Sequence, residues 1–506
     1  MANRYAVATG TWDTTNTSIW SATDGGAPGA SAPTSSDKAL LTAASGAITV
    51  TLGANVSCLE CIQTGFTGTL DWAGNKITVA GVSWVGSATC TNTGTPVVEV
   101  AYAGSSSVSI AGSSLAEANA VSFNVTAATG ALTVSGGVKS LNLTGFTGSL
   151  VNSARAIYGS LTWSPTATYT AGTNTTTFAA TSGTQVITSN GVTLDFPITV
   201  AAVGGTVQLA NALTMGSTRT FTHTAGTFDA NNKNVTTGRF AASGATTRVT
   251  SMGTGTWTIL DAGATAWSTP AAASHTVTPS TSTVLMTAAT AKTFVGGGRT
   301  FWNLSNGGAG ALTITGANTF NDLQNTVTPA TFTLPASTTT TVSALSLAGT
   351  AGNLVTLQSS SAGTRATLSK ASGAVNVSFL SIKDIAATGG ATWQAKPHNG
   401  NLDAGNNTGW TFPHDTVAAA SMAMTAYAPG VEINVPVPLA SMTLTAHLPS
   451  VEIIIPVPLA AMVMTAYAPT FSEEFLGSLA GIVRIRPAMS GAITVRPALS
   501  GRVTIN

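Results

Sequence analysis

Two cysteines, Cys58 and Cys61, have the spacing closest to that of a reactive or metal-binding motif. A Cys-x-x-Cys pair can form half of a zinc site or a redox-active dithiol. Here a second pair is missing, no histidine lies nearby, and the third cysteine, Cys90, stands alone. Because free cysteine packs as a small apolar side chain, we expect all three to lie in β-strands.

Acidic residues are the next candidates for chemistry, since glycan-cleaving enzymes place two carboxylates about 5 to 9.5 Å apart across the scissile bond. No Asp or Glu lies between Glu117 and Asp195, or between Asp261 and Asp322. Through the middle of the chain the acids occur singly: Asp195, Asp229, Asp261 and Asp322. We predict no catalytic residue, and a glycan-depolymerising tailspike enzyme remains an alternative because a coiled fold can bring distant acids together.

The histidines are equally isolated. His223 lies in an alternating segment, 220–224, that predicts a strand with His223 on its polar outer face. His414 and Asp415 follow a proline at a predicted domain junction, where we expect a hinge. The remaining histidines have no partner at the spacing of metal ligands: His275, His398 and His447.

Asp403, Asn406 and Asn407 form an oxygen-rich segment that could hold calcium. Its spacing and charge depart from the EF-hand pattern, so an Asx turn is the simpler interpretation. The glycine run 296–298 lacks the Gly-Lys-Ser/Thr that completes a phosphate-binding loop. The sequence therefore predicts neither a metal nor a cofactor.

The overall composition describes a folded protein with very few charges. Of 506 residues, 43% are hydrophobic and 7% are charged, and the formal net charge is +1. A disordered chain would combine low hydrophobicity with high charge. Nucleic-acid binding requires clustered Lys and Arg, which are absent before the short arginine series 484–502, so we expect no nucleic-acid partner.

The chain start and its most apolar segment bear on localisation. The opening residues lack the apolar region of a secretory signal. The segment 451–467 is interrupted by Glu452, Pro456 and Pro458, so we expect no membrane insertion. These features predict synthesis in a cytoplasm without a cleavable signal.

Residues 41–412 consist of short alternating segments that must position any functional side chain. The modules 47–50, 131–134 and 311–314 are nearly the same, and the segment 64–70 returns almost unchanged at 144–150. Alternation of Val, Ile or Leu with Thr or Ser gives each strand one buried and one wet face. Such self-similarity is typical of repeat architectures.

These patterns predict an all-β protein whose body is an elongated β-solenoid. Tiny side chains, recurrent modules and scarce charge favour stacked coils, and tandem β-sandwich domains are the alternative. With coils of about 20 residues stacked about 4.8 Å apart, the body would be a rod on the order of 80 Å long. Residues 1–40 precede it as a cap or a docking segment, anchored by Trp12 and Trp20.

Beyond residue 412 the sequence repeats with new periods. A twenty-residue unit recurs over 413–470, and a ten-residue unit over 471–506. Alternating apolar residues without enough partner surface in one chain predict burial against further copies, as in an intertwined trimer, and disorder is the alternative. The repeat positions that we expect in this oligomer core are Met422, Met442, Met462, Tyr427 and Tyr467.

Two segments resemble known families. The opening, with residues 3–5, Trp12, Trp20 and residues 33–37, is similar to the start of uncharacterised tail-fibre or head-appendage proteins of phages. Residues 379–384 and 406–412 resemble the closing coils of right-handed β-helix surface proteins of phages and bacteria. The resemblance implies a virion structural protein.

We therefore expect a non-enzymatic virion component, a fibre, spike or capsid appendage that contributes to particle architecture or host-surface adhesion. Its expected partners are other copies of itself, as a homotrimer, other virion proteins and a host-surface glycan. A bacterial cell-surface adhesin is a further alternative, which the absence of a secretory signal disfavours.

Overall fold

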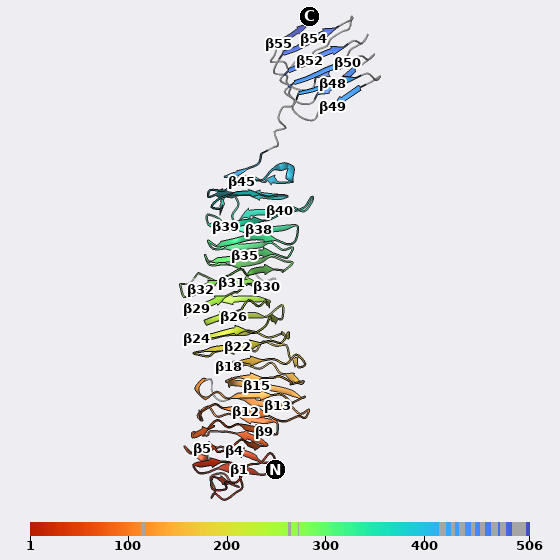
Figure 1. The fold of residues 1–506 in the computed structure, drawn as a ribbon. Coiled ribbons are helices and arrows are strands. Elements are labelled where there is room, and N and C mark those ends of the chain that lie inside the picture. Colours follow the sequence, from red (N-terminus) through yellow and green to blue (C-terminus); the bar gives the residue numbers. More distant parts are fainter. Residues whose placement is uncertain are drawn as a thin grey trace. The chain divides into compact units, whose positions relative to one another are not determined.

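The computed structural model describes residues 1–112, 117–261, 265–271 and 273–413, together with the backbone of eight C-terminal strands. The chain forms two compact units, Met1–Phe412 and Pro413–Asn506, which are described separately. The first unit contains a β-solenoid of about 16 turns over residues 38–403, which confirms the predicted fold class (Figure 1). At about 4.8 Å per coil, the stack is roughly 75 Å long.

The strands of successive coils pair in parallel ladders, so the tandem β-sandwich alternative is wrong. Two ladders begin at the N-terminus. The first comprises β1 (Asn3–Ala6), β4 (Lys38–Leu40), β7 (Glu60–Ile62), β10 (Ser83–Val85), β13 (Val108–Ala111), β15 (Ala131–Val138), β17 (Ser149–Leu150) and β20 (Thr168–Tyr169). The second comprises β2 (Gly10–Trp12), β5 (Thr49–Leu52), β8 (Thr69–Asp71) and β11 (Thr91–Thr93).

A third ladder runs through the middle of the body. It comprises β6 (Val56–Cys58), β9 (Ile77–Val79), β12 (Val97–Val100), β14 (Ser122–Val125), β16 (Leu141–Asn142), β19 (Leu161–Thr162), β22 (Thr184–Thr188), β24 (Ile198–Leu209), β26 (Thr220–Asp229), β29 (Arg248–Ser251) and β32 (His275–Thr278). A fourth starts at β15 and shares β24 and β26 with the third. Its other members are β18 (Arg155–Ile157), β21 (Thr176–Phe178), β28 (Arg239–Ala242), β31 (Trp267–Ser268), β34 (Lys292–Val295), β36 (Leu312–Thr315), β38 (Ala330–Leu334), β40 (Val355–Ser359), β43 (Leu380–Lys383) and β46 (Leu402–Asp403).

The C-terminal half of the body adds a fifth ladder and a short sixth one. The fifth comprises β23 (Thr193–Leu194), β25 (Leu213–Met215), β27 (Val235–Thr237), β30 (Thr256–Ile259), β33 (Thr283–Met286), β35 (Thr300–Asn306), β37 (Thr319–Asn325), β39 (Thr339–Ser346), β41 (Ala366–Ser369) and β44 (Ile385–Thr388). The sixth comprises β42 (Ala374–Asn376), β45 (Thr392–Gln394) and β47 (Trp410–Thr411). Helical structure in the described residues is limited to three 3-10 turns, Ala43–Ser45, Glu117–Asn119 and Pro397–Asn399, so no helix there could span a membrane.

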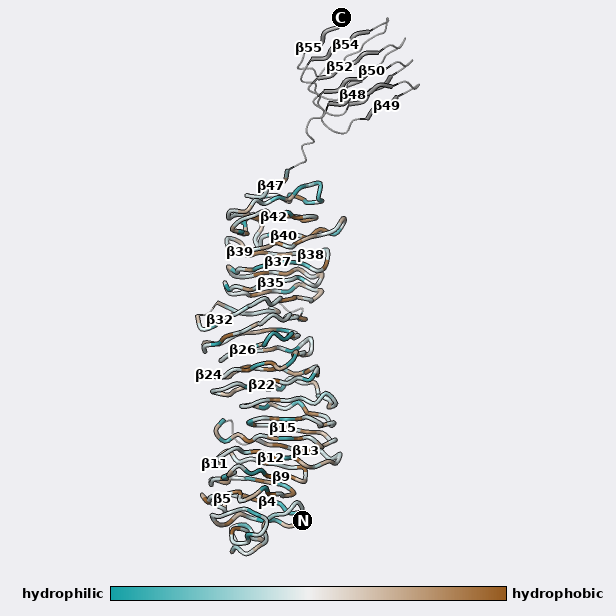
Figure 2. Tube along the Cα trace, in the orientation of Figure 1, coloured by the Kyte–Doolittle hydropathy of each residue, from teal (hydrophilic) through white to brown (hydrophobic). Residues whose placement is uncertain are grey.

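Alternation within each strand builds one continuous core. In β5, Val50 and Leu52 are fully buried while Thr49 and Thr51 face outward. The same pattern repeats from coil to coil, so a single apolar cluster extends from Ala6 to Trp410, and apolar and polar residues alternate along the trace (Figure 2). Each coil thereby buries its apolar face against the next one.

Parallel register stacks like side chains inside the core. Phe221, Phe240, Trp267 and Phe294 occupy paired positions of β26, β28, β31 and β34. Successive ring centroids lie 5.9, 4.4 and 5.7 Å apart. This column of rings connects four coils through the interior, and each ring adds a large apolar area to the core.

The repeated segments 64–70 and 144–150 form the same corner in two different coils. Phe66 and Phe146 are fully buried. A Cβ added at Gly68 would lie 2.2 Å from the Ile48 carbonyl oxygen, and one at Gly148 would lie 2.0 Å from that of Gly130. Both positions require glycine because the neighbouring coil's backbone passes too close for any side chain.

The N-terminal segment belongs to the same stack. β1 pairs in parallel with β4, and β3 (Trp20–Ser21) pairs with β1 in the antiparallel sense. Trp12 and Trp20 are fully buried and meet edge to face, with ring centroids 5.0 Å apart. Both rings therefore extend the apolar core at this end, while the choice between a cap and a docking segment stays a prediction.

The second unit contains two further parallel ladders. One comprises β48 (Ser421–Ala426), β50 (Ser441–Ala446), β52 (Ala461–Ala466), β54 (Ile482–Pro487) and β55 (Arg502–Ile505), and the other comprises β49 (Val431–Asn434), β51 (Val451–Ile455) and β53 (Glu474–Phe475). Met422, Met442 and Met462 occupy the same register position. Tyr427 and Tyr467 lie outside the described residues. The oligomer core proposed for these five residues stays a prediction.

Candidate functional site

Most acids of the body contact the coil next to their own. Five ion pairs each join residues 22 to 24 positions apart, about one coil: Lys38–Glu60 (2.6 Å), Lys76–Glu99 (3.5 Å), Glu117–Lys139 (3.0 Å), Asp195–Arg219 (2.6 Å) and Arg239–Asp261 (2.7 Å). Asp229 accepts a hydrogen bond from Gln208 Nε2 at 2.8 Å, and Asp322 accepts one from the Ser346 amide at 3.0 Å. The isolated acids thus serve as cross-links along the stack.

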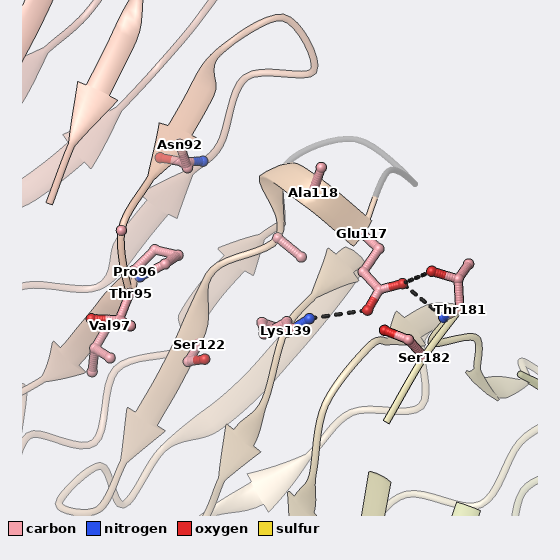
Figure 3. A pocket seen from close by; sticks show the side chains of 12 residues that line it. Asn92, Thr95, Pro96, Val97, Glu117, Ala118, Ser122, Lys139, Thr181 and Ser182 are labelled. Atoms are coloured by element: carbon pink, nitrogen blue, oxygen red, sulfur yellow. Dashed lines mark hydrogen bonds and ion pairs between the residues drawn. The ribbon is translucent and has the colours of Figure 1, made fainter. Parts of the chain in front are cut away.

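A surface groove of about 500 Å³ lies beside β12 and β14 and contains one carboxylate, that of Glu117 (Figure 3). Glu117 Oε1 accepts a bond from Lys139 Nζ at 3.0 Å. Its Oε2 accepts bonds from both the amide and the hydroxyl of Thr181, each at 2.7 Å. The remaining lining mixes polar side chains, such as Asn92 and Ser122, with the apolar Pro96 and Val97.

The surroundings of Glu117 keep this carboxylate ionised. Burial alone would raise its pKa, but hydrogen bonds from Thr181 and Lys139 outweigh burial and hold the pKa below its usual range. A general acid in glycan hydrolysis needs the opposite shift. Glu117 is instead suited to holding the 117–121 loop against a coil that lies 64 positions further along the chain.

Two histidines that the sequence separates by 52 positions meet inside the body. The prediction that His223 faces outward is wrong, since its side chain is fully buried and His275 is 2% exposed. His223 Nδ1 lies 2.9 Å from the Thr250 hydroxyl, and His275 Nε2 lies 3.0 Å from the same hydroxyl. Stacking of β26, β29 and β32 creates this cluster. The spacing of the two histidines along the chain could not predict it, because it does not show which residues of neighbouring coils pair.

The proton positions of the cluster follow from its acceptors. His223 Nε2 lies 3.1 Å from the Gly226 carbonyl, which can only accept, so Nε2 carries the hydrogen and Nδ1 is the acceptor. The Thr250 hydroxyl therefore donates to His223 and accepts from His275 Nε2. Burial lowers the pKa of His223 to about 4 and that of His275 to about 3, so both rings are neutral at pH 7.

Three cations are also buried, each at the start of a strand. Arg155, Arg248 and Lys292 donate to the carbonyls of Val151, Gly244 and Ala288, in each case four residues upstream. Lys292 Nζ also donates to the carbonyls of Gly308 and Gly310, and burial lowers its pKa to about 8. These contacts fasten the loop that precedes each strand, which is a structural role that the sequence did not reveal.

Cys58 and Cys61 lie in strands, as predicted, and all three cysteines are buried and free. The prediction is wrong for Cys90, which lies immediately before β11 and not in a strand. Burial raises the pKa of Cys90 to about 12, so its thiol is protonated and unreactive at pH 7. Cys61 also has a raised pKa, through its hydrogen bond with Cys58 and through burial. Among the described residues, no three His, Cys, Asp or Glu side chains form a metal-binding group.

Residues 403–407 form the predicted Asx turn. Asp403 Oδ1 accepts the Gly405 amide at 3.0 Å and Asn407 Nδ2 at 2.7 Å. Asn406 reaches a different coil, where its Nδ2 donates to Asp384 Oδ1 at 2.6 Å. These side chains join the last coils of the body, which also contain Trp393 and Trp410 with ring centroids 5.1 Å apart.

Comparison with known proteins found no relative: no protein-family model matches the chain, and no significant match was found among curated proteins or solved structures.

Proposed function

We propose that the protein is a non-enzymatic structural component of a phage particle, a fibre, spike or capsid appendage. The observation that carries the proposal is the continuous core from Ala6 to Trp410, which makes the body one uninterrupted stack of coils. Inter-coil ion pairs along the stack add to its rigidity. A rigid stack roughly 75 Å long holds whatever it carries at a fixed distance from its point of attachment.

The opening and closing segments support the assignment to a virion. They resemble phage tail-fibre or head-appendage proteins and right-handed β-helix surface proteins, and both segments belong to the ordered body. In this proposal one end of the chain attaches to other virion proteins, the twenty-residue repeats associate as a homotrimer, and the exposed flank of the body meets a host-surface glycan.

Mass spectrometry of purified particles tests the location. We expect the chain in particles at a fixed copy number, whereas its absence would refute a virion role. Light scattering of the full chain tests the trimer, and a monomeric mass with an ordered C-terminal unit would refute self-association. Incubation with host capsule or lipopolysaccharide tests the non-enzymatic assignment, since release of new reducing ends would contradict it.

A further inference from the structure

One tryptophan is exposed, whereas all the others are buried. The chain has ten tryptophans, and nine of them are buried: Trp12, Trp20, Trp72, Trp84, Trp163, Trp257, Trp267, Trp393 and Trp410. Trp302, in β35, is 37% exposed. Single exposed apolar residues are ordinary on protein surfaces, so the neighbours of Trp302 decide whether its exposure has a use.

The backbone exposes Trp302 at a break in the alternation of its strand. In β35, Phe301 and Leu304 are buried, and the two residues between them, Trp302 and Asn303, both face outward. Strict alternation would put only one residue outside, so the strand bends here. β37 repeats the bend in the next coil, where Asn321 and Asp322 face outward between buried Phe320 and Leu323.

Parallel register brings these two strand bends side by side. Phe301 pairs with Phe320, and Asn303 pairs with Asp322, which places Trp302 beside Asn321 on adjacent strands. We call Trp302, Asn303, Asn321 and Asp322 the Trp302 ridge. It presents one indole ring, two amides and one carboxylate over two coils that are about 4.8 Å apart.

Hydrogen bonds hold the polar part of the ridge in place. Asn321 Nδ2 donates to Asn303 Oδ1 at 3.2 Å, and Asn303 Nδ2 donates to Thr283 Oγ1 at 3.3 Å. Asp322 Oδ1 accepts the Ser346 amide at 3.0 Å, which leaves its second oxygen to accept from another group. Groups fixed in advance lose less conformational entropy when a ligand binds.

This combination of groups matches the chemistry of a sugar ring. A pyranose has an apolar face of C–H groups, which packs on an aromatic ring, and a rim of hydroxyls, which both donate and accept. Amides supply donors and acceptors to that rim, and a carboxylate supplies a strong acceptor. The carboxylate of Asp322 disfavours phosphate-rich or uronate-rich polymers, because like charges would meet.

We propose that the Trp302 ridge binds one or two rings of a neutral saccharide on the host surface, an inference that rests on the adhesive role proposed above. Trp302 provides the stacking platform, and Asn303, Asn321 and Asp322 orient the hydroxyls. The site binds and does not cleave.

The test uses the full chain and an array of neutral oligosaccharides built from glucose, galactose, mannose or N-acetylglucosamine, followed by calorimetry on the oligosaccharides that bind. We expect at least one to bind, and Trp302→Ala to weaken that affinity at least about tenfold, the cost of roughly 1.4 kcal/mol of lost stacking. Trp302→Phe should recover part of the affinity, and Asn321→Ala should weaken it without affecting the fold.

Val203→Ala is the matched control, because Val203 is also an exposed apolar side chain but lies in β24, away from the ridge. An unchanged urea midpoint for Trp302→Ala would exclude misfolding as the cause of lost binding. Binding of none of the oligosaccharides by the natural chain, or equal affinity of the Trp302→Ala variant, would overturn the inference. Particles that contain the protein and adsorb to hosts equally well with Trp302→Ala would refute the ridge alone, whereas absence from particles would refute only the virion proposal.

Discussion

Acid should open the middle of the body selectively, because His223 and His275 are buried there as neutral rings beside Thr250. Their pKa values in the folded protein are about 4 and about 3. Unfolded histidine has a pKa near 6.5, so the open coils bind more protons than the closed ones as the pH falls below about 6.5. The free energy of opening these coils is therefore highest at pH 7.5 and decreases as the pH falls toward 4. Near pH 4 the folded rings begin to bind protons too, which limits any further loss.

The size of the effect follows from the two histidines. At pH 5 each open ring binds a proton that the closed ring excludes, which costs about 2 kcal/mol per histidine, or roughly 4 kcal/mol together. After burial, the guanidinium of Arg299, which donates to the His275 carbonyl, and the nearby Arg248 contribute to the low pKa of His275. A loss of this size corresponds to about a thousandfold lower protection against local opening.

Hydrogen exchange followed by mass spectrometry is the appropriate assay, since a solenoid opens locally rather than as one cooperative unit. Peptides from β26, β29 and β32 should lose about three orders of magnitude of protection between pH 7.5 and pH 5, after correction for intrinsic exchange. His275→Gln should reduce the loss to about thirtyfold, and His398→Gln, at an exposed position, should leave it unchanged. Equal losses in the histidine-free coils 41–160 would refute the reasoning.

Three further changes test the packing and the groove. Trp267→Ala removes the ring that lies closest to a neighbour in the aromatic column, 4.4 Å from Phe240 between centroids. It should cost about 3 to 5 kcal/mol of local stability, measured as lost hydrogen-exchange protection in β28, β31 and β34, with Trp267→Phe costing much less. Gly68→Ala should sharply reduce soluble yield because its Cβ meets the Ile48 carbonyl at 2.2 Å, whereas Gly183→Asn, at an open left-handed position with φ +70°, should be tolerated. Glu117→Gln should release the loop it fastens at a cost of about 1 kcal/mol, seen as faster proteolysis there, and unchanged proteolysis would contradict that role.

The sequence by itself determined the class of fold. Thr alternating with Val, Ile or Leu can bury only one face of a strand, and the repeated segments 64–70 and 144–150 both became glycine corners around a buried phenylalanine. The burial of Cys58 and Cys61 in strands followed from their apolar character, and the Asx turn at Asp403 followed from local spacing. These features depend on contacts within a few residues or on a simple period.

Only the tertiary structure decided what the coils bring together. His223 was assigned to the wrong face because its segment alternates with threonines, and the partner that holds it inside, Thr250, lies 27 positions away. Coil lengths vary, so the sequence does not specify which residues stack. The Trp302 ridge likewise exists because two strands bend at the same height and their register aligns Asn303 with Asp322. Composition and alternation were enough to predict a solenoid, whereas the lengths of its coils determine which side chains of adjacent coils lie next to each other.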